Sequence, residues 1–206
     1  MDFITANGID WVLAVQSLGV WLELPMRFFS FLGDENFFFL VLPLLYWSVD
    51  ARLGLRVAFI LISSNFLSSF VKLLFALPRP YWISTQVQPL GAETTFGIPS
   101  GHAQNAVALW GIMADRVRRR GASIAAFFLA FLIGFSRVYL GLHFVWDVVA
   151  GWLIGGLLLF AFMTLWNPVS AWITNQSPAR QIIIAFIASL IMIGLGAWQV
   201  TRLGEY

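Results

Sequence analysis

Long apolar stretches without charged residues restrict the possible folds of this chain more than any other feature of its sequence. Residues 148–166 and 182–200 contain no charged residue. Of the 206 residues, 60% are hydrophobic and only 11% are charged, whereas a soluble domain usually has about 25% charged residues. Such a chain has too few polar groups to cover a surface that faces water on all sides. The sequence therefore predicts an integral membrane protein.

A membrane-crossing helix needs roughly 20 mostly apolar residues, because each adds about 1.5 Å across a hydrocarbon core about 30 Å thick. We expect six such helices, over residues 36–49, 53–76, 102–115, 122–139, 144–166 and 182–200. The stretch 9–32 is apolar but contains Glu23, Pro25 and Arg27, which an amphipathic helix at the membrane interface tolerates better than a central span. The predicted fold is thus an all-α polytopic helix bundle with six transmembrane helices and an N-terminal interfacial helix. Seven spans are the alternative.

Charge and composition narrow the class of protein further. A net charge of +2 gives no basic footprint for a nucleic-acid partner. The absence of cysteine excludes disulfides and thiolate metal sites. Residues 1–5 lack the basic start and the cleavage site of a secretory signal, so we expect the whole chain to be mature. No linker or low-complexity tract divides the chain, which predicts one domain over residues 1–206.

The basic residues of the short loops predict the orientation in the membrane. By alternation, three loops lie on one side, and they contain Arg52, Arg56, Arg116, Arg118, Arg119, Arg120 and Arg180. Because short cytoplasmic loops are enriched in Lys and Arg, this side should be cytoplasmic. The segment 77–100 and the joint 141–142 then face outward. We expect an integral protein of the cell (inner) membrane with its active site on the periplasmic or extracellular side.

Six ionisable residues lie at the outer ends of the predicted spans, although they are scattered over the sequence. The alternating topology places them at one membrane level: Lys72, Arg79, His102, Arg137, His143 and Asp147. Ionisable groups near membrane helices are costly and usually functional. Their convergence predicts a single polar site.

The residue types in this set suit the binding and transfer of phosphate. Three cations match a phosphate dianion, and arginine can bind its oxygens bidentately. Ser100 and Gly101 open the helix at His102, where free N–H groups can bind an anion. His143 and Asp147 are four residues apart and share a helical face, so the carboxylate can orient the imidazole. His102 remains as a general acid. Arg137 could also form a structural ion pair with Asp147.

Three motifs in the chain resemble those of the type 2 phosphatidic acid phosphatase family, which includes glucose-6-phosphatase and vanadium haloperoxidases. The first runs from Lys72 through six residues to Arg79-Pro80, and the second is Pro99-Ser100-Gly101-His102. The third runs from Ser136-Arg137 through His143 to Asp147. They occur in the family order, and the resemblance covers a core of about residues 29–166. The C-terminal transmembrane helix predicted at about 182–200 lies outside this core.

The resemblance implies a phosphatase that uses no metal and no cofactor. His143 would attack phosphorus and form a phosphohistidine, and Asp147 would orient it. His102 would protonate the leaving oxygen and then activate water. The phosphoryl oxygens would be held by Lys72, Arg79, Ser100, Gly101 and Arg137.

The sequence leaves the substrate open. A phosphate site at membrane level suits a lipid phosphate or pyrophosphate, such as a polyprenyl pyrophosphate, phosphatidate, phosphatidylglycerol phosphate or a sphingoid phosphate. A glucose-6-phosphatase-like sugar phosphatase, a lipid phosphotransferase with the same intermediate and a non-enzymatic anion transporter are the alternatives. We expect lipid phosphate and membrane lipids as partners. The oligomeric state is not encoded in any pattern that we identify.

Overall fold

The computed structural model describes residues 2–204, and the side chains of residues 7–204. This part of the chain is helical and contains no strand. The helices are α1 (Asp2–Gln16), η1 (Val20–Leu22), α2 (Glu23–Phe31), α3 (Glu35–Leu44), η2 (Leu45–Val49), α4 (Ala51–Phe75), α5 (Pro80–Ile83), α6 (Gly101–Val117), α7 (Arg120–Tyr139), α8 (Val145–Thr174) and α9 (Pro178–Gly204).

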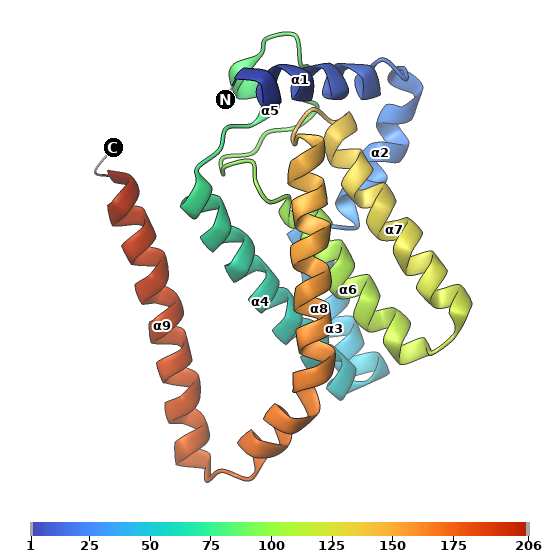
Figure 1. Cartoon of the computed structure of the whole chain (residues 1–206). Helices are drawn as coiled ribbons and strands as arrows, with labels where there is room; N and C mark the ends of the chain where they lie inside the picture. The colour runs from blue at the N-terminus through green and yellow to red at the C-terminus, as the bar shows by residue number, and fades with distance from the viewer. Residues whose placement is uncertain (1, 205–206) are drawn as a thin grey trace.

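Helix α6 lies at the centre of the bundle, against α4, α7 and α8 (Figure 1). Its packing with α4 forms the main apolar cluster, which includes the buried residues Val57, Ile60, Leu109 and Ile112. On the other side, α8 approaches α6 so closely that a Cβ added to Gly155 would lie 2.7 Å from the carbonyl oxygen of Gln104. The close contact fixes α6 relative to α8, and both helices carry site residues at their N-terminal ends.

Four helical segments are long and apolar enough to cross a membrane: Ala51–Ile83, Arg120–Tyr139, Val145–Thr174 and Pro178–Gly204. They confirm four of the six predicted spans. The other two predicted spans also form helices, but these are shorter: α6 has 17 residues, and the apolar segment Glu35–Val49 is interrupted by Pro43 and ends in the π-helical turn η2. The number of spans by length and composition is four, or five if the bent N-terminal pair counts as one.

The N-terminal region differs from the single interfacial helix predicted over residues 9–32. Two helical segments, Asn7–Gln16 and Val20–Phe31, meet at an angle of 81°. Gly19 between them has a φ of 106°, a conformation that glycine adopts without steric cost. Helix α1 lies across one end of the bundle, and α2 runs beside α7 (Figure 1). The prediction of one helix was wrong because the glycine break is local and apolar residues continue across it.

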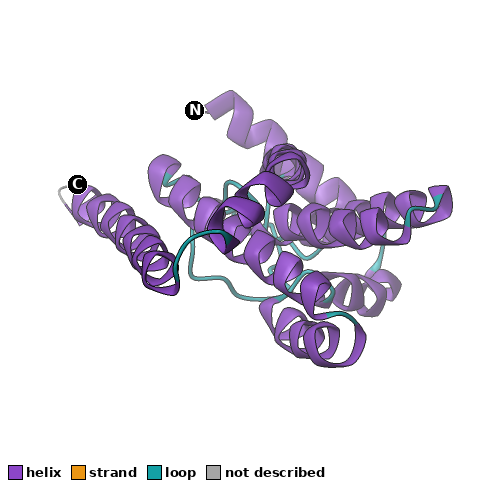
Figure 2. Cartoon of the chain, turned by 90° about the horizontal axis from the view of Figure 1, so that it is seen from below, coloured by secondary structure: helices purple, strands orange, loops and turns teal. Residues whose placement is uncertain are grey.

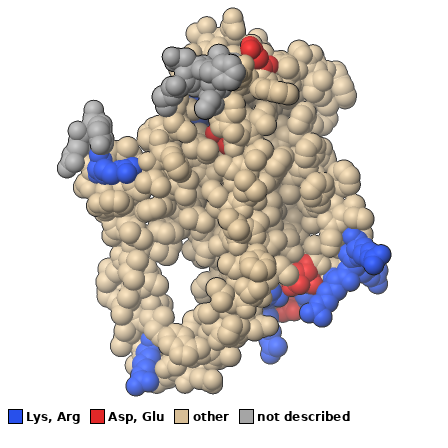
Figure 3. Space-filling model, viewed as in Figure 1, with Lys and Arg blue, Asp and Glu red and all other residues tan. Residues whose placement is uncertain are grey.

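The two ends of the bundle differ in charge. The turns after η2, between α6 and α7, and between α8 and α9 lie at the lower end in Figure 1, where arginines gather on the face shown in Figure 3. Ion pairs join Arg56 to Asp115 at 3.5 Å and Arg116 to Asp50 at 3.6 Å there. The segment between α5 and α6 lies at the opposite end. This arrangement matches the predicted separation of the basic loops from the outer segment.

Helix α9 stands away from the rest of the bundle (Figures 1 and 2). It meets α4 near its own C-terminus, where Arg202 Nη2 donates to the carbonyl oxygens of Leu73 at 3.2 Å and Leu74 at 2.9 Å. Figure 3 shows an opening between α9 and the bundle. None of the site residues described below comes from α9.

Candidate active site

A polar cavity lies at the end of the bundle opposite the basic turns. Its volume is about 410 Å³. Five of the eight predicted site residues line it: Lys72, Arg79, Gly101, His102 and His143. Phe39 of α3, with 74% of its surface exposed, and the exposed Ser69 of α4 form part of the same wall. The fold therefore brings together residues from α4, α6 and the segment before α8.

The remaining three predicted residues, Ser100, Arg137 and Asp147, lie directly behind the cavity wall. Ser100 is buried, and its Oγ accepts from the N–H of Ala103 at 3.5 Å as the N-cap of α6. Its backbone N–H donates to the carbonyl oxygen of Asp147 at 2.8 Å. The predicted helix start at Ser100 is confirmed. The hydroxyl of Ser100 caps α6, and the adjacent Gly101 lies at the cavity surface.

His143 and Asp147 form a buried pair, each about 1% exposed. His143 Nδ1 lies 3.3 Å from Asp147 Oδ2. The same carboxylate oxygen accepts from the N–H of Phe144 at 2.9 Å and so caps α8. Gly141, with a φ of 71°, forms the turn that leads from α7 to His143. The side chain of Asp147 is thus fixed by the helix end that it caps.

Arg79 selects one tautomer of His143. Its Nη1 lies 3.1 Å from His143 Nε2 and donates to the carbonyl oxygen of Leu142 at 2.9 Å. A guanidinium group only donates hydrogen bonds, so Nε2 must be the acceptor. The proton of the neutral imidazole then lies on Nδ1, towards Asp147. The lone pair of the ring therefore lies on Nε2, where it accepts from Arg79.

Lys72 and Arg79 both hold the segment before α6. Lys72 Nζ donates to Thr95 Oγ1 at 3.0 Å and to the carbonyl oxygen of Phe96 at 2.8 Å. Arg79 Nη2 donates to the same two atoms, at 3.1 and 3.2 Å. The two cations therefore converge on one point of the wall beside His143.

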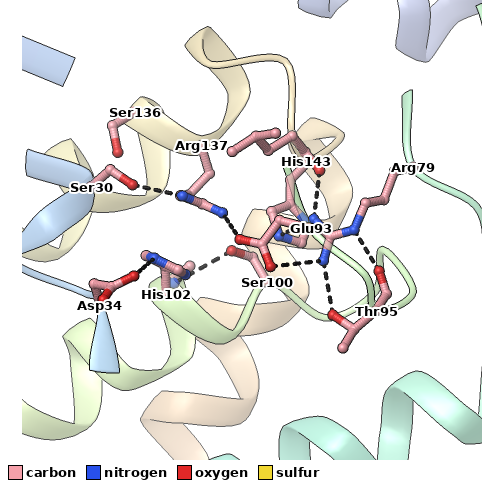
Figure 4. Close-up of polar contacts among 12 residues, drawn as sticks. Ser30, Asp34, Arg79, Glu93, Thr95, Ser100, His102, Ser136, Arg137 and His143 are labelled. Carbon is pink, nitrogen blue, oxygen red and sulfur yellow. Dashed lines mark hydrogen bonds and ion pairs between the residues drawn. The ribbon is translucent and has the colours of Figure 1, made fainter. Parts of the chain in front are cut away.

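Glu93 lies between two of the cations, as Figure 4 shows. Its carboxylate forms an ion pair with Arg137 and lies 3.7 Å from Arg79 Nη2. Arg137 also donates to Ser30 Oγ at 2.6 Å, so the ion pair with Asp147 considered from the sequence is not formed. Burial opposes the ionisation of Glu93, but the charges of Arg137 and Arg79 outweigh it and hold the pKa of this carboxyl below its ordinary value. Sequence reasoning missed Glu93, because nothing in an irregular segment indicates which side chain turns inward.

Asp34 is a second acidic residue that the sequence analysis did not include in the site. Its Oδ2 lies 3.6 Å from His102 Nε2 (Figure 4). Its Oδ1 accepts from the N–H of Asn36 at 2.9 Å, as the N-cap of α3. The imidazole of His102 holds the pKa of this carboxyl well below its ordinary value, against the effect of burial. The sequence signal was an acidic N-cap before an apolar helix, which by itself predicts only a helix start.

Among the described residues, no group of three or more His, Asp or Glu side chains is placed to hold a metal ion. The arrangement is a cavity with one imidazole of fixed tautomer, a second imidazole beside a carboxylate, and three cations. Such a site can bind a phosphoryl group and present a nitrogen nucleophile to it.

The fold and the site define a helical membrane protein with a polar cavity that histidine and arginine side chains line. The sequence pattern of the PAP2 superfamily matches residues 53–171, more than half of the chain. The chain therefore belongs to the PAP2 superfamily, as its motifs predicted.

Individual relatives agree with this assignment. The chain is 29% identical to lipid phosphate phosphatase delta of Arabidopsis thaliana, over 82% of this chain and 45% of the relative. It is 31% identical to human glucose-6-phosphatase 3, over 77% of this chain and 53% of the relative. The chain thus spans about half the length of these relatives. The crystal structure of a transmembrane PAP2-type phosphatidylglycerolphosphate phosphatase from Bacillus subtilis superposes with a TM-score of 0.69 and 26% identity, over 80% of this chain and 87% of that one.

Proposed function

We propose that this protein is a membrane phosphatase that hydrolyses a lipid phosphate through a phosphohistidine intermediate on His143. The observation that carries the proposal is the donor contact from Arg79 to His143 Nε2, together with Asp147 at Nδ1. The two contacts select the tautomer whose Nε2 is nucleophilic. His143 lines a cavity together with Lys72 and Arg79, where a phosphoryl group would be attracted, oriented and bound by Arg79 in place of Nε2.

The other residues have complementary roles in this proposal. Lys72, Arg79 and Arg137 bind the phosphoryl oxygens, and the backbone at Ser100 and Gly101 adds N–H donors at the start of α6. His102 protonates the oxygen of the leaving group and then removes a proton from the attacking water. Asp147 orients His143. No step requires a metal or a cofactor, because positioning and charge stabilisation come from side chains.

We also propose that residues 1–206 act as one membrane domain with six spans, in which α6 and the α3–η2 segment cross the bilayer inside the bundle. Buried residues of α6, such as Leu109 and Ile112, support this arrangement, since a helix covered by its neighbours needs less apolar surface. The cavity would then open on the periplasmic or extracellular side of the cell membrane, opposite the basic turns.

A sugar phosphate is a second candidate substrate. The cavity wall contains the uncharged polar side chains of Asn36, Asn65, Ser69 and Asn105, which can bind hydroxyl groups near the phosphate. The relation to human glucose-6-phosphatase 3 favours the same class. A lipid phosphate remains the first candidate, because the wall also includes the exposed aromatic ring of Phe39 on the outer surface of the bundle.

The test is phosphate release by the purified protein in detergent, from phosphatidate, a sphingoid phosphate, a polyprenyl pyrophosphate and glucose 6-phosphate. We expect His143→Asn and His102→Ala to lower kcat by at least about 10³-fold. The matched control is Glu23→Gln, because Glu23 pairs with Arg27 on α2 and does not line the cavity. A labelled phosphoryl group should be trapped on His143 in the His102→Ala variant. Turnover that survives His143→Asn would contradict the proposal.

A further inference from the structure

The charges on the cavity wall are divided unequally between its two sides. The lining cations, Lys72 and Arg79, lie beside His143, and no other lysine or arginine belongs to the lining residues. Three carboxylates belong to the same wall, those of Asp34, Glu35 and Glu93. The positive charge is thus concentrated at one point, and the rest of the cavity is neutral or acidic.

The acidic side is where a leaving group would lie. Attack by His143 Nε2 requires the leaving oxygen on the far side of phosphorus, in line with the new bond. The proposed general acid for that oxygen is His102, and the Asp34 carboxylate lies 3.6 Å from its ring. The atoms attached to the leaving oxygen therefore enter the part of the cavity that contains Asp34 and Glu35.

The backbone of Glu93 is held by Tyr81, and its carboxylate is held by two arginines. Tyr81 Oη donates to the carbonyl oxygen of Glu93 at 2.9 Å and accepts from the N–H of Glu93 at 3.2 Å. The side chain then reaches Arg137 and Arg79. Glu93 is thus held beside these two arginines, and Asp34 and Glu35 remain as the carboxylates of the acidic side.

From this distribution we infer that the cavity accepts one phosphoryl group and excludes a second, so that the protein acts on phosphomonoesters and discriminates against diphosphates. The inference rests on the proposed function and names its substrate class. A diphosphate would place its inner phosphate on the leaving-group side, against the carboxylates of Asp34 and Glu35 and without a lysine or arginine among the lining residues there. Like charges repel more strongly in a partly buried site than in water.

The chemical steps are the same for a monoester and for a diphosphate, and only the leaving group differs. His143 Nε2 forms a bond to phosphorus as the bond from phosphorus to the bridging oxygen breaks, and His102 transfers its proton to that oxygen. Water then attacks the phosphohistidine, loses a proton to His102 and releases inorganic phosphate. With a monoester the leaving group is a neutral alcohol. With a diphosphate it is a charged phosphate ester, which is the species that the acidic wall repels.

The test is a competition between farnesyl phosphate and farnesyl diphosphate, which share one tail and differ only in the second phosphate. The ratio of the two kcat/KM values in a mixture does not depend on the fraction of protein that is folded. We expect the wild type to favour the monoester at least about tenfold. Glu35→Gln should reduce this preference by about tenfold, because it removes one repulsive charge from the leaving-group side, and Glu23→Gln should leave it unchanged.

Inhibition of the wild type by inorganic phosphate and by pyrophosphate is a second measurement that needs no variant. Pyrophosphate should inhibit no better than phosphate. A wild-type preference for the diphosphate, tighter inhibition by pyrophosphate, or a ratio unaltered in an active Glu35→Gln variant would each overturn the inference. If phosphate is released neither from the two farnesyl substrates nor from the wider panel, the proposed function is contradicted, and this inference with it.

Discussion

His102 is positioned differently from His143, and the difference can be tested at the level of one residue. His143 is buried between Arg79 and Asp147, whereas His102 lies at the cavity surface beside Asp34. A cation next to an imidazole favours its neutral form, and a carboxylate favours its protonated form. His143 thus has a cation and a carboxylate as neighbours, whereas the ion-pair partner of His102 is a carboxylate.

We predict that Asp34→Asn moves the alkaline limb of the kcat–pH profile to lower pH by about one unit, because the protonated form of His102 loses a nearby negative charge. Asparagine caps helices as well as aspartate does, so the start of α3 should be retained. The measurement is kcat between pH 5 and 9 (about the accessible range of an imidazole acid). Asp10→Asn on α1 is the matched control, and an unshifted profile in Asp34→Asn would show that Asp34 only caps the helix.

Glu93 gives a prediction for stability as a function of pH. Its folded-state pKa is lowered from an ordinary value of 4.5. The ionised carboxylate of Glu93 therefore stabilises the folded state. This stabilisation is fully present above the ordinary pKa and is lost as the pH falls through the lower folded-state pKa. Between neutral pH and the acid range, the thermal unfolding midpoint should decline less steeply in Glu93→Gln than in the wild type. Parallel curves for the two proteins would mean that folding does not lower the pKa of Glu93.

The sequence predicted the residues that carry the chemistry but not all the residues that hold them. Lys72, His102 and His143 could be placed together because each lies at a predicted helix end, and alternation fixes the side of the membrane. Glu93 and Thr95 could not, because the segment before α6 has no periodicity that relates its residues to a face. Contacts within irregular segments depend on the tertiary fold, which local patterns do not encode.

At the scale of helices, the packing of α8 on α6 sets the distance between the two imidazoles. Gly151 and Gly155 face α6, where a Cβ would lie 2.6 Å from the carbonyl oxygen of Ser100 and 2.7 Å from that of Gln104. Gly156, the next residue, has no atom within 4 Å of the same position. The two adjacent glycines thus differ only in the face on which they lie.

We predict that Gly155→Ala destabilises the protein by about 1–3 kcal/mol, because the added methyl group forces α8 away from α6. Gly156→Ala should be neutral or stabilise slightly, since alanine favours helix more than glycine does. Thermal unfolding in detergent checks both variants, with phosphate release measured alongside. Equal unfolding temperatures for the two would contradict the close packing described here.

Helix positions were more predictable than helix ends and bends. The boundaries of α7 and α9 follow apolar stretches and lie close to the predicted ones. The angle of 81° between the N-terminal segments was not predicted, because apolar residues lie on both sides of Gly19. Hydrophobicity indicates which residues avoid water, and the backbone conformation of one glycine decides the direction of the chain.

At the scale of the whole molecule, the orientation in the membrane can be tested with single cysteines, because the chain has none of its own. Gln86→Cys lies in the segment between α5 and α6, and Arg119→Cys lies in the turn between α6 and α7. In intact cells, a membrane-impermeant maleimide should label Gln86→Cys and should label Arg119→Cys only after permeabilisation. The reverse pattern would place the cavity on the cytoplasmic side.

The exposed ring of Phe39 and the hydroxyl of Ser69 open the cavity wall toward the side of the bundle. A lipid that arrives there travels within the plane of the bilayer and never crosses bulk water. The encounter rate then follows the number of substrate molecules per unit area of membrane. For the proposed lipid substrate, dilution with an inert amphiphile should slow turnover even at a constant amount per litre, because the rate would follow the surface density of the substrate.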